Sequence, residues 1–360
     1  MKNSIIKFVL LSITLTYILI DSSICQQFTK YEVIVNAQFG MEDKKIGFNK
    51  NEGAVFNNFP GDFIVDQKDN IIIADNDKEQ IHFFNKFGHW EKSISMPTFV
   101  DDGKSRLEWT GGTRTRMKLS LDGLNQIYIN VCFGVNEYGI YKIDTNRISV
   151  VQISLNGKIP GIDKRVIGFF VSKNGIIYLH TSPVGNPLDT SNPDFAYDKN
   201  GKLLGQVDYY IENSEGDVYR LSSEHKGYKS FVKYLKGINK GMVASDQLVR
   251  ESKEEHLPFG NTGSMYGNFY TFAGIDWKDN LYVTNGEITK QYDKNLNLVK
   301  DYSTPLKQFE EKNIFTDQTK LKISPNGSMY IMVVTSDEKV DKINVKDFTK
   351  LYIQILKINK

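Results

Sequence analysis

The stretch FPGDFIVDQKDNIIIADNDKEQIHFFNKFG, from Phe59 to Gly88, decides the fold. It divides into the apolar runs DFIVD, IIIAD and QIHFF, which are separated by the polar segments QKDN and NDKE and followed by NKFG. Short runs rich in β-branched and aromatic residues, bounded by polar turns, are typical of β-strands. The stretch therefore predicts three short strands joined by tight turns, and a fourth follows near Trp90 to Ser95.

The same pattern recurs along the rest of the chain. The repeated units are Phe59–Gly88, Lys118–Val131, Gly168–His180, Asp208–Leu221, Phe272–Asn285 and Leu321–Val334. Equivalent positions recur at intervals of roughly 40 to 60 residues, which suits one four-stranded propeller blade for each unit. We therefore predict an all-β, six-bladed β-propeller of four-stranded antiparallel blades, over residues 26–360 as one domain.

The unit from Phe59 to Gly88 also resembles an NHL-type repeat of the TolB-like propellers. It has an inner strand ending in Val65-Asp66, an Asp-Asn turn, a strand ending in Ala74-Asp75 and a strand ending in Phe84. The unit from Phe272 keeps Ile275-Asp276 and Asp279-Asn280-Leu281-Tyr282. This resemblance supports the propeller fold, but propellers serve as scaffolds, receptors and enzymes alike.

Two segments outside the units predict how the ring closes. Tyr31 to Ala37, YEVIVNA, is strand-like, and the chain ends in LYIQILKI. We expect the N-terminal strand to pair with the C-terminal one, which would remove an open sheet edge from the last blade.

The first 25 residues match an export signal. Lys2 and Lys7 flank an apolar run from Phe8 to Ile20, which is too short to span a bilayer. Cleavage between Cys25 and Gln26 is the prediction; lipidation of Cys25 and an uncleaved anchor are the alternatives. The sequence thus predicts an exported protein, either secreted, periplasmic or on the cell surface, with no membrane span after cleavage.

The composition is that of an ordinary globular protein. The 45 Lys and Arg residues nearly balance 43 Asp and Glu, and the formal charge is +2. This net charge indicates neither nucleic acid nor an anionic membrane as a partner. A monomer is expected, and Cys132 has no partner for an intrachain disulfide once Cys25 has been removed.

The sequence holds no recognisable catalytic or cofactor motif. Equivalent inner-strand positions that could form a metal ring are Asp62, Lys118, Gly168, Asp208, Phe272 and Lys320. This mixture does not form a calcium site, and the five histidines fall at dissimilar positions of their units. No cofactor is predicted. A polar ring, Asp66, Asp122, Ser172, Glu212, Asp276 and Ser324, ends the innermost strands, and we expect these side chains to bond the turn backbone.

The long connections suggest where a ligand binds. Segments 96–115, 237–267 and 304–319 link units, whereas 181–193 and 335–348 lie between second and third strands, so propeller topology puts all five at one end of the ring. Exposed Trp and Arg are frequent anchors of binding sites. We therefore predict a binding module for a protein, peptide or glycan, with Trp109, Arg114, Arg116 and His180 as candidate residues. The alternative is a metal-assisted hydrolase or lyase, similar to a lactonase, with its site at the channel mouth.

Overall fold

The structure is a computed structural model. It describes residues 31–40, 42–47, 61–96, 116–132, 138–144, 149–155, 164–183, 194–207, 211–223, 228–234, 250–258, 271–284, 288–303, 314–336 and 350–358. The regular elements of these residues are antiparallel β-strands, as the alternating apolar pattern predicts. The export signal, with Cys25 and Gln26, lies outside the described residues.

The described strands form six four-stranded sheets, which we number in chain order. Sheet 1 contains β2 (Asp62–Val65), β3 (Ile71–Asp75), β4 (Gln80–Phe84) and β5 (Trp90–Ser95). Sheet 2 contains β6 (Arg116–Leu121), β7 (Ile127–Cys132), β8 (Tyr138–Asp144) and β9 (Ser149–Ile153). Sheet 3 contains β10 (Lys164–Val171), β11 (Ile177–Pro183), β12 (Asp194–Tyr197) and β13 (Leu203–Val207).

The second half of the chain repeats this order. Sheet 4 contains β14 (Ile211–Glu212), β15 (Val218–Ser223), β16 (Tyr228–Tyr234) and β17 (Arg250–Pro258). Sheet 5 contains β18 (Thr271–Ile275), β19 (Leu281–Thr284), β20 (Ile288–Tyr292) and β21 (Leu298–Ser303). Sheet 6 contains β22 (Ile314–Ile323), β23 (Met329–Ser336), β24 (Leu351–Ile358) and, at its outer edge, β1 (Tyr31–Gln38).

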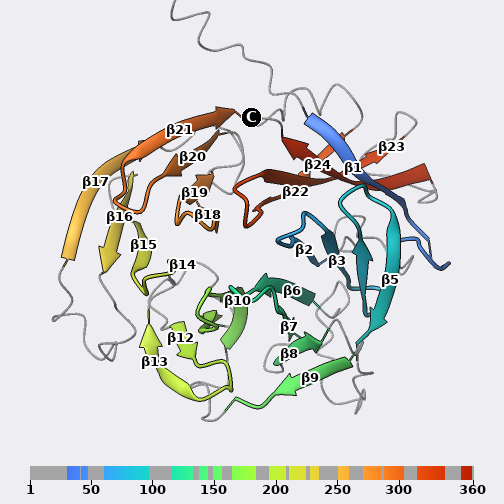
Figure 1. Cartoon of the computed structure of the whole chain (residues 1–360), viewed down its shortest axis with the longest axis horizontal. Coiled ribbons are helices and arrows are strands. Elements are labelled where there is room, and N and C mark those ends of the chain that lie inside the picture. Colours follow the sequence, from blue (N-terminus) through green and yellow to red (C-terminus); the bar gives the residue numbers. More distant parts are fainter. Residues whose placement is uncertain are drawn as a thin grey trace, which may run out of the picture.

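The sheets stand around a common centre with their first strands innermost (Figure 1). The inner strand β2 packs against β6 on one side and against β22 on the other, and β18 also contacts both β14 and β22. Contacts between the first and last sheets are those of a ring. The fold is therefore a β-propeller with four-stranded antiparallel blades.

The hydrophobic core lies between neighbouring sheets. Phe63 and Val65 of β2 pack toward sheet 6, whereas Ile64, which alternates with them, packs toward sheet 2. Because a strand inside a ring has a neighbouring sheet on both faces, both sets of its side chains are buried. This explains why the run Ile71 to Ala74 is apolar without alternation and why all of β3 is buried.

The N-terminal strand completes the last sheet, and this predicted pairing is confirmed. β1 runs antiparallel to β24, with Tyr31 opposite Ile358 and Ala37 opposite Ile353. The chain then continues to sheet 1, where the Gly47 amide donates a 2.6 Å hydrogen bond to Asp75. The N-terminal segment thus joins the last sheet to the first. Within the described part of the chain, no helix has the length and hydropathy needed to cross a membrane.

Candidate functional site at the ends of the central channel

The strand order gives the propeller two different ends. At the short-turn end lie the turns that follow each first strand and each third strand, such as 66–70 and 85–89. At the other end, which we call the long-loop end, lie the connections between sheets and those between second and third strands. Segments 96–115, 181–193 and 335–348 connect strands at the long-loop end, and so does 304–313, whereas the rest of 304–319 belongs to β22. The expectation that 237–267 is one link between units is wrong, because β17 lies within it. Residues 237–249 therefore follow the third strand of sheet 4, at the short-turn end, and 259–267 lead to sheet 5 at the long-loop end.

The turns of the short-turn end are built from one repeated hydrogen-bonding pattern. Asp66 Oδ1 accepts bonds of 2.8 Å from both the Lys68 and the Asn70 amides, and Asp276 does the same for Lys278 and Asn280. Asp122 forms the same pair of bonds, while Ser172 and Ser324 each accept one. Bonding of these side chains to the turn backbone is as predicted.

The fourth sheet requires a correction of one position. Its turn is capped by Asn213, whose Oδ1 accepts the amides of Glu215 and Asp217, and not by Glu212 as the sequence suggested. Glu212 instead accepts hydrogen bonds of 2.8 Å from Asn174 and from the Tyr178 hydroxyl of sheet 3. A pair of adjacent polar residues made either one a candidate cap, and only the pairing of Ile211 with Tyr219 fixes the register.

The turns are also bonded to one another around the ring. The Gly123 amide donates to the Lys173 carbonyl at 3.0 Å, and the Trp277 amide donates to the Pro325 carbonyl at 2.9 Å. Side chains make the remaining steps: Asn125 accepts from the Gln67 amide, and Asn326 donates to the Gln67 carbonyl. We call this ring of hydrogen bonds between neighbouring turns the turn belt. The contacts of Lys173, Asp279 and Ser214, described next, complete it.

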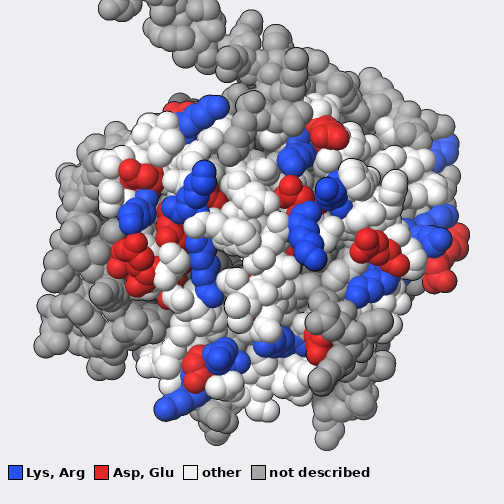
Figure 2. Space-filling view, viewed as in Figure 1, with Lys and Arg blue, Asp and Glu red and all other residues white. Residues whose placement is uncertain are grey.

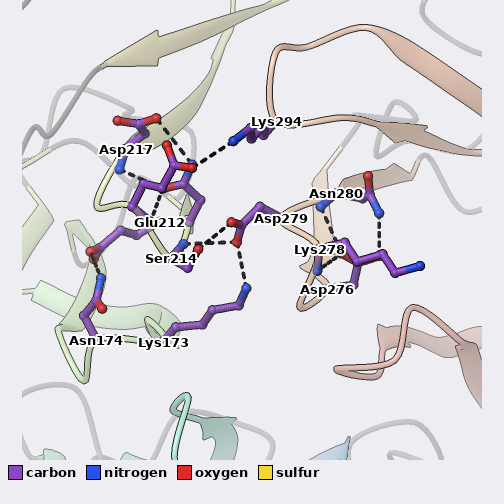
Figure 3. Close-up of polar contacts among 12 residues, drawn as sticks. Lys173, Asn174, Glu212, Ser214, Asp217, Asp276, Lys278, Asp279, Asn280 and Lys294 are labelled. Carbon is purple, nitrogen blue, oxygen red and sulfur yellow. Dashed lines mark hydrogen bonds and ion pairs between the residues drawn. The ribbon is translucent and has the colours of Figure 1, made fainter.

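Sheets 3, 4 and 5 are joined in the turn belt by a charged cluster (Figure 3). Lys173 Nζ lies 2.7 Å from Asp279 Oδ1, and Ser214 donates its amide to Oδ1 and its hydroxyl to Oδ2 of the same carboxylate. Burial raises the pKa of Asp279, but Lys173 and Ser214 outweigh it, so the pKa lies below its ordinary value. The turn belt therefore holds Asp279 as a carboxylate whose oxygens are already engaged.

A second charged cluster lies at the start of the innermost strand of sheet 1, at the long-loop end. Asp62 is buried, and Lys322 Nζ of sheet 6 lies 2.9 Å from its Oδ1. Asp62 Oδ2 accepts the Leu119 amide of sheet 2 at 3.1 Å, and Lys320 donates to the Gly61 carbonyl. Burial raises the pKa of Asp62, but the nearby Lys322 and Lys320 lower it by more than burial raises it, so the pKa lies below its ordinary value.

This cluster lies at inner-strand positions that were considered from the sequence as members of a metal-binding ring. Asp62 and Lys320 do come together, and Lys322, which the sequence did not single out, supplies the counter-charge. An ammonium group close to the carboxylate stands where a cation would bind. Among the described residues, no group of three or more His, Cys, Asp or Glu side chains is placed to hold a metal ion.

The buried histidine of sheet 1 serves a network that the sequence did not predict. His82 lies with Nε2 3.0 Å from Asp75 Oδ2 and Nδ1 2.7 Å from Ser93 Oγ, and Trp90 Nε1 donates to the same Oγ. Asp75 also accepts the amides of Asp77 and Lys78. The histidine is packed, and its partners fix the loop against which the N-terminal segment lies.

The predicted binding residues are only partly covered by the structure. Trp109 and Arg114 lie outside the described residues. Arg116 begins β6 opposite Cys132, and His180 lies in β11 opposite Gly168, so their backbones belong to the neighbouring sheets 2 and 3. Their side chains are not described, and the assignment of these four residues to a binding site stays a prediction.

Comparisons with known proteins identify structures but no family. No protein-family model matches the chain, and no curated protein matches it. Among solved structures, virginiamycin B lyase from Staphylococcus aureus is 10% identical with a TM-score of 0.46, covering 91% of this chain and 99% of that one. Regucalcin, a calcium-binding protein from Agrobacterium tumefaciens, is 11% identical with a TM-score of 0.45, covering 84% and 91%. The strand topology defines the chain as a β-propeller with four-stranded blades, and these similarities add nothing about its activity.

Proposed function

We propose that this protein is an exported propeller that binds a protein, peptide or glycan at its long-loop end. The observation that carries the proposal is the difference between the two ends. At the short-turn end, the capping side chains of the turns after first strands accept backbone amides, and the turn belt bonds these turns to one another. Four of the five long segments, 96–115, 181–193, 304–319 and 335–348, adjoin the opposite end, and loops that exceed what ring closure requires are often functional.

The same proposal includes the finer features of the fold. We infer that the six sheets are the blades of one six-bladed ring of NHL type, spanning residues 26–360. The contact of β2 with β22 and the pairing of β1 with β24 support a closed ring. Export is supported by the sequence pattern of the first 25 residues, with cleavage before Gln26.

The Asp62 cluster bears on the alternative of a metal-assisted hydrolase or lyase. Its carboxylate, which is the acidic inner-strand group of sheet 1, is already neutralised by Lys322 at 2.9 Å. A cation entering here would have to displace an ammonium group and would meet Lys320 as well. The cluster is better suited to holding sheets 6, 1 and 2 together beneath a binding surface than to activating water.

The proposal is tested with the triple variant Trp109→Ala, Arg114→Ala, Arg116→Ala. Immobilised protein is exposed to a glycan array and to solubilised envelope of the producing cell, and captured ligands are compared with those of the wild type. We expect the wild type to capture a defined ligand and the triple variant to lose it while keeping its thermal unfolding midpoint. A matched control, Lys68→Ala with Leu124→Ala at the short-turn end, should retain capture.

Two results would overturn the proposal. Equal capture by the triple variant would move the site away from the predicted loop. One equivalent of bound metal together with turnover of a lactone or ester panel would favour the enzyme instead.

A further inference from the structure

An aspartate, a histidine and a serine form a hydrogen-bonded chain in sheet 1 that leads from the interior to the surface. Asp75 of β3 and His82 of β4 are each only 1% exposed, whereas Ser93 of β5 is partly exposed. His82 Nε2 lies 3.0 Å from Asp75 Oδ2, and His82 Nδ1 lies 2.7 Å from Ser93 Oγ. Both distances are those of the hydrogen bonds that join a nucleophilic serine, its base and the group that orients the base.

The surroundings of Asp75 fix the direction of these hydrogen bonds. Its carboxylate accepts three backbone amides, those of Gly47, Asp77 and Lys78. Because the carboxylate acts as an acceptor, His82 Nε2 donates to it, which leaves the lone pair of Nδ1 to accept the Ser93 hydroxyl proton. The imidazole is therefore held in the tautomer that a general base for this serine needs.

Strand pairing positions the three side chains. Ser93 lies directly opposite His82 in the register of β4 and β5, and Asp75 ends β3. Phe84 and Trp90, which face each other across the same strands, pack on the side of sheet 1 that faces sheet 6. Trp90 Nε1 donates to Ser93 Oγ at 3.3 Å. The serine oxygen thus lies between a proton acceptor and an N–H donor, and this donor would stabilise the negative charge that develops on the oxygen as its proton leaves.

Groups that can bind the carbonyl oxygen of a substrate also lie near Ser93. β5 is the outermost strand of sheet 1, so alternate backbone amides along its outer edge are not used by the sheet. Lys44 Nζ lies 5.3 Å from the centre of the Trp90 ring and adds a positive charge there. On the face of the propeller that Figure 2 shows, basic and acidic side chains are mixed, which gives no strong field of one sign. A small neutral ester is therefore the substrate class that fits.

We propose that Ser93 is the nucleophile of an esterase site, with His82 as its general base and Asp75 as the group that orients His82. As Ser93 Oγ attacks the carbonyl carbon of the ester, its proton passes to His82 Nδ1, and the histidine gives this proton to the departing alcohol oxygen. Water then attacks the acyl-serine and loses a proton to His82. Release of the carboxylic acid returns that proton to Ser93, so the cycle consumes only ester and water.

The test uses the full chain and two probes: diisopropyl fluorophosphate, which phosphorylates activated serines, and 4-nitrophenyl acetate. We expect one phosphoryl adduct, located on Ser93 by peptide mass mapping, and ester hydrolysis that persists in EDTA. Ser93→Ala should lose both. The matched control, Ser95→Ala, changes an exposed serine of the same strand and should keep both. A wild type without an adduct on Ser93 would overturn the proposal, whatever the outcome of ligand capture at the long-loop end.

A second comparison measures what His82 contributes. His82→Gln should slow the phosphorylation of Ser93 by on the order of a hundredfold, the usual contribution of a general base. Because replacing a buried histidine also costs stability, the comparison is repeated with His82 intact. Ser93→Cys should react with iodoacetamide about tenfold faster than Ser95→Cys, or more, since an adjacent imidazole favours the thiolate. Equal rates for the two cysteines would show that the network is structural only and would overturn the proposal.

Discussion

Lys173 of sheet 3 and Asp279 of sheet 5 are joined at 2.7 Å although sheet 4 lies between them in the chain order. The inner strand of sheet 4, β14, has only two residues, and Ser214 in the following turn bonds the same carboxylate. One side chain thus holds three sheets together at the point where the inner strand is shortest. The consequence is that Asp279 contributes to ring closure as well as to its own turn.

Replacing Asp279 should therefore destabilise the fold. Asp279→Asn keeps a residue that tolerates the positive φ of 61° at this position, but it removes the charge that faces half-buried Lys173. Loss of a charged hydrogen-bonding partner at such a site costs about 2 kcal/mol in the free energy of unfolding. Urea unfolding followed by circular dichroism measures it. The exposed pair Lys294 and Glu215 is the control, since Lys294→Met should change nothing measurable.

The same carboxylate gives the stability a defined dependence on pH. The pKa of Asp279 in the folded protein lies below its unfolded value of about 3.9, so folding favours the ionised form. Its contribution is complete above the unfolded pKa and is lost as the pH falls through the folded pKa. The difference in unfolding free energy between wild type and Asp279→Asn should be constant from neutral pH to about pH 5 and shrink below about pH 3.9. A difference that grows on acidification would contradict the assignment.

The turn belt can be tested at Gly123, where the turns of sheets 2 and 3 are in close contact. A Cβ atom on Gly123 would lie 2.6 Å from the Lys173 carbonyl oxygen, which is backbone and cannot move alone. Gly123→Ala should therefore push sheets 2 and 3 apart at the short-turn end and destabilise the protein by about 1–3 kcal/mol. Gly40→Ala is the control, because its Cβ would meet only the mobile ends of the Glu42 and Lys45 side chains. Equal thermal unfolding midpoints of the two variants would show that the turns of sheets 2 and 3 can separate without loss of stability.

Most of the fold could be predicted because each strand carries its signal locally. The alternation of Leu119 with Leu121, the turn Asp69-Asn70 and the strand Tyr31 to Ala37 depend on neighbours in sequence or on the need to cover an edge. Asp69 and Asp279 do adopt positive φ in their turns, the conformation that Asp and Asn tolerate best. The capping residue of the turn in sheet 4 was predicted as Glu212 instead of Asn213, because two adjacent polar side chains can each accept amides of the turn.

The contacts between sheets could not be predicted, because they join residues far apart in the sequence. Nothing near Asp62 indicates that its partner is Lys322, 260 residues later. One signal was present and was missed: the second strands repeat a tyrosine, at Tyr128, Tyr178, Tyr219, Tyr282 and Tyr330. Tyr282 donates to Asp276 at 3.0 Å, and burial together with Asp276 raises its pKa. A tyrosine repeated beside a capping acid is evidence that the acid is structural.

Ring closure by the N-terminal strand gives the last prediction. Deleting Tyr31 to Ala37 removes the pairing of β1 with Ile353 to Ile358 of β24 and uncovers Ile353 and Ile355, which are fully buried. It also releases the segment whose Gly47 amide bonds Asp75 in sheet 1. An unpaired strand of this length is a template for pairing with another chain. We therefore expect a lower thermal unfolding midpoint and concentration-dependent association, measured by calorimetry and by light scattering coupled to gel filtration. The control lacks only residues 1–25 and should stay monomeric, since β1 is intact. If the shorter variant remained as stable and as monomeric as this control, β1 would be a dispensable addition to a ring closed by β22 to β24 alone.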